Sequence, residues 1–276
     1  MKRRTLVFIS IVFIIGLSVL LYPTVSNYVN SLNQSKAIEE YDNMVSKLSK
    51  TDYSNTFQKA EEYNKALISN PNRFKLSEAE RKTYDDILNV TGDGLIGYIE
   101  IDKIGVKLSI SHGMGEQVLE EGIGHMEGSS FPCGGESSHA VLVGHRGLPS
   151  AKLFTDLDQM KEGDTFTIHI LDRLLTYQVC MITVVEPSDM KDLAIEDGKD
   201  YVTLVTCTPY AVNSHRLLVR GVRIENKKEE SNAVNNKTRT ADRKAFDLSE
   251  YAPVIVAASL LSIFIFLVIR FIRKRE

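Results

Sequence analysis

Several features are scarce in this sequence of 276 residues, and each scarcity excludes a class of protein. The net charge is only −3, so the chain lacks the basic balance that is usual in nucleic-acid-binding domains. No Cys or His pair has zinc-like spacing with a matching second pair, and no glycine-rich loop ends in Lys-Ser or Lys-Thr to bind phosphate. No internal repeat is visible. We therefore expect no nucleic acid, no metal and no other cofactor.

Cysteine is also scarce, and its count of three is odd. At least one thiol therefore stays free unless it pairs between chains. Cys180 lies in the apolar run 177–182, where we expect a buried thiol that acts as a small hydrophobe. Cys133 lies in a turn-rich segment and is expected to be an incidental surface residue. Cys207 ends a β-branched run and precedes a turn, which would hold its thiol rigidly yet within reach of a substrate.

The few net charges are unevenly placed. Residues 1–4 and 270–276 each carry +3, so the stretch between them carries −9. Inside each basic tip lies an uncharged apolar run, at 5–22 and 252–269, and the second extends to 272 if Arg270 snorkels. About 20 residues of helix, with roughly 17 as a lower limit, cross a bilayer. Basic flanks mark the cytoplasmic side, so the sequence predicts two membrane passes with residues 23–251 outside.

Each apolar run has an alternative interpretation. The first could be a cleaved signal peptide, but it is long for one and no Ala-x-Ala cleavage site follows it. The second could be a buried core helix, although its place beside a basic terminus favours a membrane span.

The region between the runs changes character at residue 92. Residues 27–89 are polar and helix-like, with apolar stripes, so we predict helices packed on the next domain rather than a solvated stalk. From residue 92, short β-branched runs bounded by glycines predict a closed barrel or a sandwich. The expected strands are 95–101, 106–110, 139–143, 165–170, 174–185, 201–206 and 216–224.

Two cations could activate the thiol of Cys207. A free Cys has a pKa of about 8.5 and needs such help to become a thiolate. His145 follows the strand-like run 140–143, and Arg216 opens a strand nine residues after Cys207. An arginine so placed can hold a carbonyl oxygen that becomes an oxyanion. The three residues would suffice for acyl transfer.

The segments around these residues resemble the sortases, which are transpeptidases of the Gram-positive cell surface. Residues 203–210 (TLVTCTPY) match the family's T-L-x-T-C-T-P-Y signature. Residues 143–147 (VGHRG) match its histidine motif, and 213–221 (NSHRLLVRG) its arginine motif. The first core strand of the family is similar to residues 97–101. The two apolar ends and the helical region resemble class C, the pilus-assembling sortases.

The resemblance implies that Cys207 is the nucleophile, His145 the general acid and Arg216 the oxyanion stabiliser, in a mainly β fold with an eight-stranded barrel. The implied reaction cleaves an LPxTG-like sorting signal between Thr and Gly and joins the acyl group to a pilin lysine. We expect a monomer whose partners are pilins and the membrane. The implied organisation is a cytoplasmic tip (1–4), a membrane helix (5–22), a helical, lid-like region (23–91), the catalytic barrel (92–225), a linker (226–251), a second membrane helix (252–272) and a tip (273–276).

Some alternatives stay open at this stage. Arg146 and Arg220 are rivals of Arg216 for binding the carbonyl, and strand geometry alone does not exclude Arg220, which points to the same side as Arg216. The motif match favours Arg216. The family's lid tripeptide, Asp-Pro-aromatic, has only Asn-Pro-Asn at 70–72 as a counterpart, with Phe74 nearby. The acceptor could be a cell-wall precursor instead of a pilin. The protein could also be an adhesin with an incidental thiol.

Overall fold

The structure is a computed structural model that describes residues 3–225. Residues 30–225 belong to one compact unit, and residues 3–29 belong to a second. The described elements begin with one long helix, α1 (Arg3–Val45), which has residues in both units.

Helix α1 contains the first predicted apolar run. Among residues 3–225 it is the one helix long and apolar enough to cross a membrane, judged by length and composition. Its candidate span is Phe8–Val45, with a mean hydropathy of 2.3, and the helix continues through Pro23 instead of ending at residue 22. The predicted linker and second membrane helix lie outside the described residues.

The last turns of α1 pack on the compact unit. The sequence places Ile38, Tyr41, Val45 and Leu48 at three- and four-residue steps, as on one helix face. The first three are buried, and Leu48, just after the helix, is partly buried against them. The Tyr41 hydroxyl donates to the carbonyl of Ile96 (3.0 Å) and accepts from the backbone N–H of Leu171 (2.8 Å). A buried side chain with both hydrogen bonds satisfied fixes the helix on the barrel. The prediction of packed helices rather than a solvated stalk is confirmed for this part of the chain.

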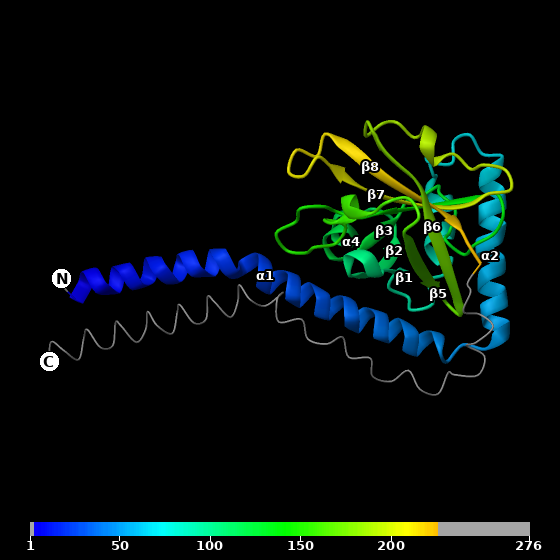
Figure 1. Ribbon diagram of the computed structural model, residues 1–276. Helices are drawn as coiled ribbons and strands as arrows, with labels where there is room; N and C mark the ends of the chain where they lie inside the picture. Colours follow the sequence, from blue (N-terminus) through cyan, green and yellow to red (C-terminus); the bar gives the residue numbers. More distant parts are fainter. Residues whose placement is uncertain (1–2, 226–276) are drawn as a thin grey trace. The chain divides into compact units, whose positions relative to one another are not determined.

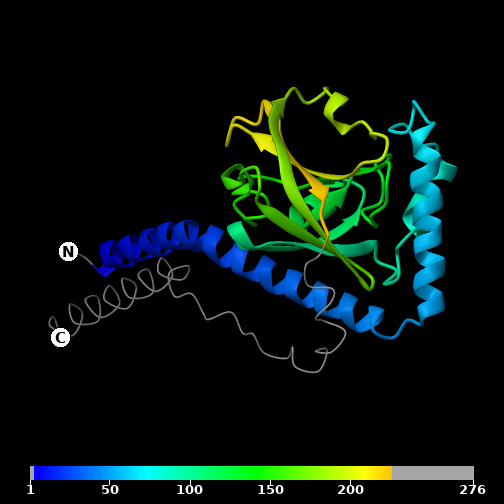
Figure 2. The same ribbon diagram turned by 45° about the vertical axis from the view of Figure 1, so that its right-hand side comes forward.

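Two shorter helices follow, α2 (Lys50–Ile68) and α3 (Glu78–Asp86). Each begins with a capping box, Ser49 with Asp52 and Ser77 with Glu80, in which the two side chains satisfy the backbone N–H groups that a helix start leaves free. The Ser49 cap sets the start of α2 at Lys50. Figures 1 and 2 both show α2 running along one side of the barrel.

Eight strands close into a barrel in the order β1-β2-β3-β4-β7-β8-β6-β5 (Figure 1). The mainly β fold predicted from the sequence is therefore confirmed. The strands are β1 (Leu95–Ile101), β2 (Val106–His112), β3 (Ile123–His125), β4 (Ser138–Val143), β5 (Thr165–Ile170), β6 (Arg173–Val185), β7 (Asp200–Thr208) and β8 (His215–Arg223), and the short helices between them are η1 (Asp102–Ile104), α4 (Glu116–Glu121), η2 (Leu157–Gln159) and η3 (Lys191–Leu193).

The seven strands predicted from sequence all occur, with ends shifted by no more than two residues. The eighth strand, β3, was missed because its three residues, Ile-Gly-His, show no alternation. It is held by its neighbours, since it pairs in parallel with β2 and antiparallel with β4.

Strands β4, β7 and β8 lie side by side and separate two apolar clusters. One face of the three strands contributes Leu142, Leu204 and Val219 to the barrel core. Because side chains alternate along a strand, the next residues point to the other face. There they form a smaller group, which we call the outer cluster: buried Val141, Leu193, Val205 and Leu218, with partly buried Phe74, Met126, Val143, Val185 and Met190.

Candidate functional site

Cys207 lies near the end of β7, directly opposite Arg216 of β8. The antiparallel register pairs the two Cα atoms. Directly opposed residues point to the same face, with Cβ atoms about 4.5–5.5 Å apart. Both residues are half-buried, so the thiol is reachable from solvent but fixed by the sheet.

His145 follows β4, on the other side of β7. The parallel register pairs Val143 with Val205. The N–H of Gly144 donates to the carbonyl of Val205 (3.0 Å), and the Thr206 hydroxyl donates to the carbonyl of Gly144 (2.8 Å). One further step along this register brings His145 beside Cys207. The three predicted site residues therefore lie at the ends of three neighbouring strands, at one end of the barrel.

The guanidinium of Arg216 keeps much of its hydrogen-bonding capacity free. Its Nη1 donates to the carbonyls of Asn213 (3.2 Å) and His215 (3.0 Å), both in its own loop. Within residues 3–225 it forms no ion pair. A guanidinium that is oriented by carbonyl groups but has no acidic partner can bind a further oxygen.

The two rival arginines are engaged elsewhere. Arg220 is buried and pairs with Glu196 (3.2 Å), while its Nη2 also donates to the carbonyl of Asp192. Arg146 pairs with Asp158 of η2. Of the three candidates, Arg216 alone has no acidic partner among the described residues, which favours it as the carbonyl-binding residue.

A buried apolar cluster continues from the thiol along the same face. On β7, Val205 is two residues from Cys207 and shares its face, as Leu218 does with Arg216 on β8. Both belong to the outer cluster. The three reactive residues at the strand ends therefore adjoin the outer cluster.

The segment at 70–76 lies against the outer cluster. Phe74 packs on the outer cluster, and the Arg73 guanidinium lies 4.2 Å from the centroid of its ring. Arg73 also donates to the carbonyls of Gly128 (2.9 Å) and Leu193 (2.6 Å). This segment is thus tied to two other loops even though it lacks the Asp-Pro-aromatic tripeptide.

The other two cysteines do not lie where the sequence predicted. Cys133 is fully buried, because α2 covers its loop and the side-chain amide of Asn64 bonds the carbonyl of Phe131 and the Cys133 Sγ (3.4 Å). Burial raises the pKa of the Cys133 thiol to about 12. Cys180 is exposed, because it alternates with Val179, which faces the core. Both predictions were wrong, and neither thiol is in a disulfide.

Two further histidines are buried and neutral. Burial lowers the pKa of His125 to about 3 and that of His139 to about 4. His139 bonds the carbonyl of Ala194 (2.7 Å) and the hydroxyl of Thr203 (2.7 Å), so it anchors the loop between β6 and β7. Sequence reasoning did not identify this role.

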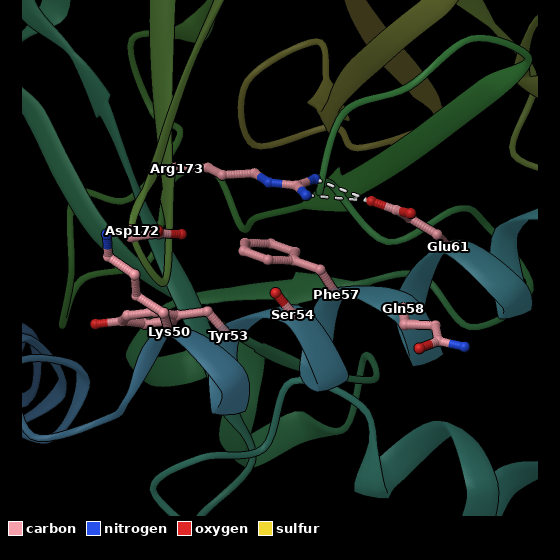
Figure 3. Close-up of a pocket in the computed structure, with 8 residues that line it drawn as sticks. All are labelled: Lys50, Tyr53, Ser54, Phe57, Gln58, Glu61, Asp172 and Arg173. Atoms are coloured by element: carbon pink, nitrogen blue, oxygen red, sulfur yellow. Dashed lines mark hydrogen bonds and ion pairs between the residues drawn. The ribbon is translucent and has the colours of Figure 1, made fainter.

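Three cavities of 300, 510 and 590 Å³ lie elsewhere in the described chain, and none is lined by Cys207, His145 or Arg216. Figure 3 shows the one of 510 Å³, between α2 and the start of β6, where Arg173 extends above Phe57 toward Glu61. The three reactive residues therefore lie outside these cavities, at one end of the barrel.

Comparison with known proteins identifies the family. The Sortase domain model matches residues 99–224. The crystal structure of sortase C1 from Streptococcus agalactiae is 49% identical, with a TM-score of 0.68, and the match covers 69% of this chain and 99% of that one. The chain belongs to the sortase family.

Other solved sortases support the same assignment. Sortase C from Streptococcus pneumoniae is 43% identical (TM-score 0.63; 69% of this chain, 97% of that one), and its structure was described as informing catalysis and pilin substrate specificity. Sortase C from Clostridium perfringens, solved with the C-terminal cell wall sorting motif, is 38% identical (TM-score 0.62; 70% and 100%). These structural neighbours are class C sortases. The chain spans 40–63% of the length of the curated relatives it matches.

Proposed function

We propose that this sortase is a cysteine transpeptidase that cleaves LPxTG-like sorting signals and polymerises pilin subunits. The observation that carries the proposal is the convergence of Cys207, His145 and Arg216 at the ends of three neighbouring strands. Acyl transfer needs a nucleophile, a proton donor and a cation close together, and these three residues supply them.

The first half of the proposed reaction forms an acyl-enzyme. The Cys207 thiolate attacks the carbonyl carbon of the Thr–Gly bond, and the carbonyl oxygen becomes an oxyanion beside the Arg216 guanidinium. When the tetrahedral intermediate collapses, the C–N bond breaks and His145 gives its proton to the departing glycine amine. The products are a Cys207 thioester and a free glycine amine.

The second half transfers the acyl group. A neutral lysine amine of the next pilin attacks the thioester carbonyl, and Arg216 again faces the oxyanion. The C–S bond breaks, the lysine proton passes to His145, and the Cys207 thiolate is regenerated. The product is an isopeptide bond, and the enzyme returns to its starting protonation state.

The outer cluster is suited to the apolar part of such a signal. It lies on the same face as Cys207, so a peptide whose Thr–Gly bond reaches the thiol can place Leu and Pro against the partly buried members of the cluster. The sorting motif bound to the Clostridium perfringens relative and the pilin specificity described for the Streptococcus pneumoniae relative support this substrate class.

We further propose that the enzyme is anchored in the membrane at both ends, with its barrel on the extracellular side. The apolar helix α1 and the basic residues at each terminus support this topology. A pilin precursor held in the same membrane would then meet the barrel at the cell surface.

Replacement of the nucleophile tests the function. We expect Cys207→Ala to abolish covalent pilin ladders, read on denaturing gels of cells that express the enzyme and its pilin, because no thioester can form. Cys180→Ala is the matched control, since it removes an exposed thiol from β6 and should leave the ladders intact. Ladders that persist in the Cys207 variant would refute the assignment. A wild-type enzyme that transfers the peptide to a cell-wall precursor but not to a pilin lysine would favour a housekeeping acceptor.

A further inference from the structure

The loop that carries His145 is built around one buried arginine. The side chain of Arg146 is only 9% exposed and ion-pairs with Asp158 of η2. Within the same loop, the N–H of Phe154 donates to the carbonyl of His145 (3.1 Å), and the N–H of Gly147 donates to the Thr155 hydroxyl (3.2 Å). The His145 loop is therefore held by one ion pair of Arg146 and by two hydrogen bonds of its neighbours.

Arg146 also faces the loop that follows Cys207. Its guanidinium carbon lies 5.7 Å from the centroid of the Tyr210 ring. The same ring approaches Gly147 so closely that an added Cβ would be 3.0 Å from it, and the φ of +75° at Gly147 likewise suits glycine. The Tyr210 ring thus rests on two consecutive residues of the His145 loop.

The contact between Arg146 and the Tyr210 ring contributes little to the stability of the fold. Tyr210 is 56% exposed, so burial of its ring contributes little to the core. Arg146 leaves its buried Nε–H without a hydrogen-bond partner, which is a costly arrangement for a charged group. Arg146 is placed one residue after His145, and Tyr210 three residues after Cys207.

We propose that Arg146 is a positioning residue that joins the His145 loop to the loop after Cys207, so that imidazole and thiol keep one arrangement. The inference rests on the proposed transpeptidase function. It differs from substrate binding by Arg146, because the guanidinium is already paired with Asp158. It predicts that loss of the contact impairs proton transfer more than peptide binding.

The test compares variants of the full chain in cleavage of a fluorogenic sorting-signal peptide. Arg146→Ala should lower kcat by about tenfold to a hundredfold, since small misplacements of reacting groups have effects of this size, with KM changed less than about threefold. Tyr210→Ala should lower kcat in the same way, and the double variant should be no worse than Arg146→Ala, because that substitution already removes the contact with Tyr210. Tyr210→Phe keeps the ring and should recover most of the lost kcat.

Arg173→Ala is the matched control. Arg173 also stacks on a ring, that of Phe57 (3.6 Å), and pairs with Glu61 (3.2 Å), but it lies beside α2 (Figure 3). Its loss should leave kcat unchanged. If Arg146→Ala also leaves kcat unchanged, or raises KM alone, the positioning role is refuted. If Arg146→Ala fails to fold by circular dichroism, Tyr210→Ala decides on the same criteria.

A second readout does not depend on the transpeptidase reaction. The rate of Cys207 alkylation by iodoacetamide, followed from pH 5 to 9, reports how neighbouring groups affect the reactivity of the thiol. We expect Arg146→Ala and Tyr210→Ala to shift this profile by at least about half a pH unit, and Arg173→Ala to leave it in place. A wild-type chain that cleaves no peptide would refute the proposed function alone. An unshifted profile would then refute the positioning role.

Discussion

At the scale of single residues, the site depends on a glycine that the reaction never touches. Gly144 joins β4 to His145, and the Phe154 ring packs directly on it. A Cβ added at this position would lie 2.6 Å from that ring, which is closer than real Cβ atoms come. The absence of a side chain at Gly144 therefore lets Phe154 pack beneath the general acid.

We expect Gly144→Ala to destabilise the barrel by about 1–3 kcal/mol, the usual cost of an overpacked core, and to lower activity because the Phe154 ring must move. Urea unfolding and peptide cleavage measure the two effects. Gly115→Ala is the control, since nothing lies within 4 Å of an added Cβ there. Equal unfolding free energies for the two variants would contradict the packing argument.

At the scale of elements, the loop between β6 and β7 (residues 186–199) is held from three sides. His139 of β4 binds the carbonyl of Ala194, Arg220 of β8 pairs with Glu196, and Arg73 binds the carbonyl of Leu193. This loop also contributes Leu193 to the outer cluster. Its position is thus fixed by charged and polar anchors.

The His139 anchor predicts a pH dependence. Its folded pKa of about 4, lowered first by burial and also by Arg220 and Arg73, is below the unfolded value of about 6.5. Between these values the unfolded chain binds a proton that the folded chain does not. The stabilisation is therefore complete above pH 6.5 and declines toward pH 4, by up to about 1.4 kcal/mol per pH unit.

Urea unfolding at pH 7, 6 and 5 checks this expectation. His139→Gln should be less stable than wild type at pH 7, and its stability should fall less steeply as the pH decreases. His215→Gln changes an exposed histidine and should keep the wild-type slope. Parallel curves for wild type and His139→Gln would show that His139 is not the titrating group.

The elements were largely predictable from the sequence, because β-branched runs between glycines are local signals. Burial was less predictable. Cys133 and Cys180 exchange their expected environments because one is covered by α2, far away in sequence, and the other alternates away from the core. The site shows the same division. The motifs marked Cys207, His145 and Arg216, but nothing local shows that Asp158 and Glu196 engage the rival arginines.

At the scale of the whole molecule, the barrel and its packed helices form a unit that begins near Asn30. Gln34 of α1 is buried and contacts two segments of this unit: its Oε1 accepts from the N–H of Ser109 (2.7 Å), and its Nε2 donates to the carbonyl of Glu121 (2.7 Å).

A fragment of residues 30–225 should therefore be soluble and folded, whereas the full chain should sediment with membranes. Cell fractionation and thermal unfolding of the purified fragment check this expectation. The substitution Gln34→Ala within the fragment should lower its melting temperature by a few degrees, because a buried hydrogen-bonded pair is lost. A fragment found in the membrane fraction would show that the barrel itself has membrane affinity.

The contacts of Arg73 have a consequence for the flexibility of the loops around the outer cluster. Its guanidinium joins the segment at 70–76 to the carbonyls of Gly128 and Leu193, and each hydrogen bond from a charged donor is worth about 1.5–3 kcal/mol. We therefore expect these three segments to loosen together rather than one at a time.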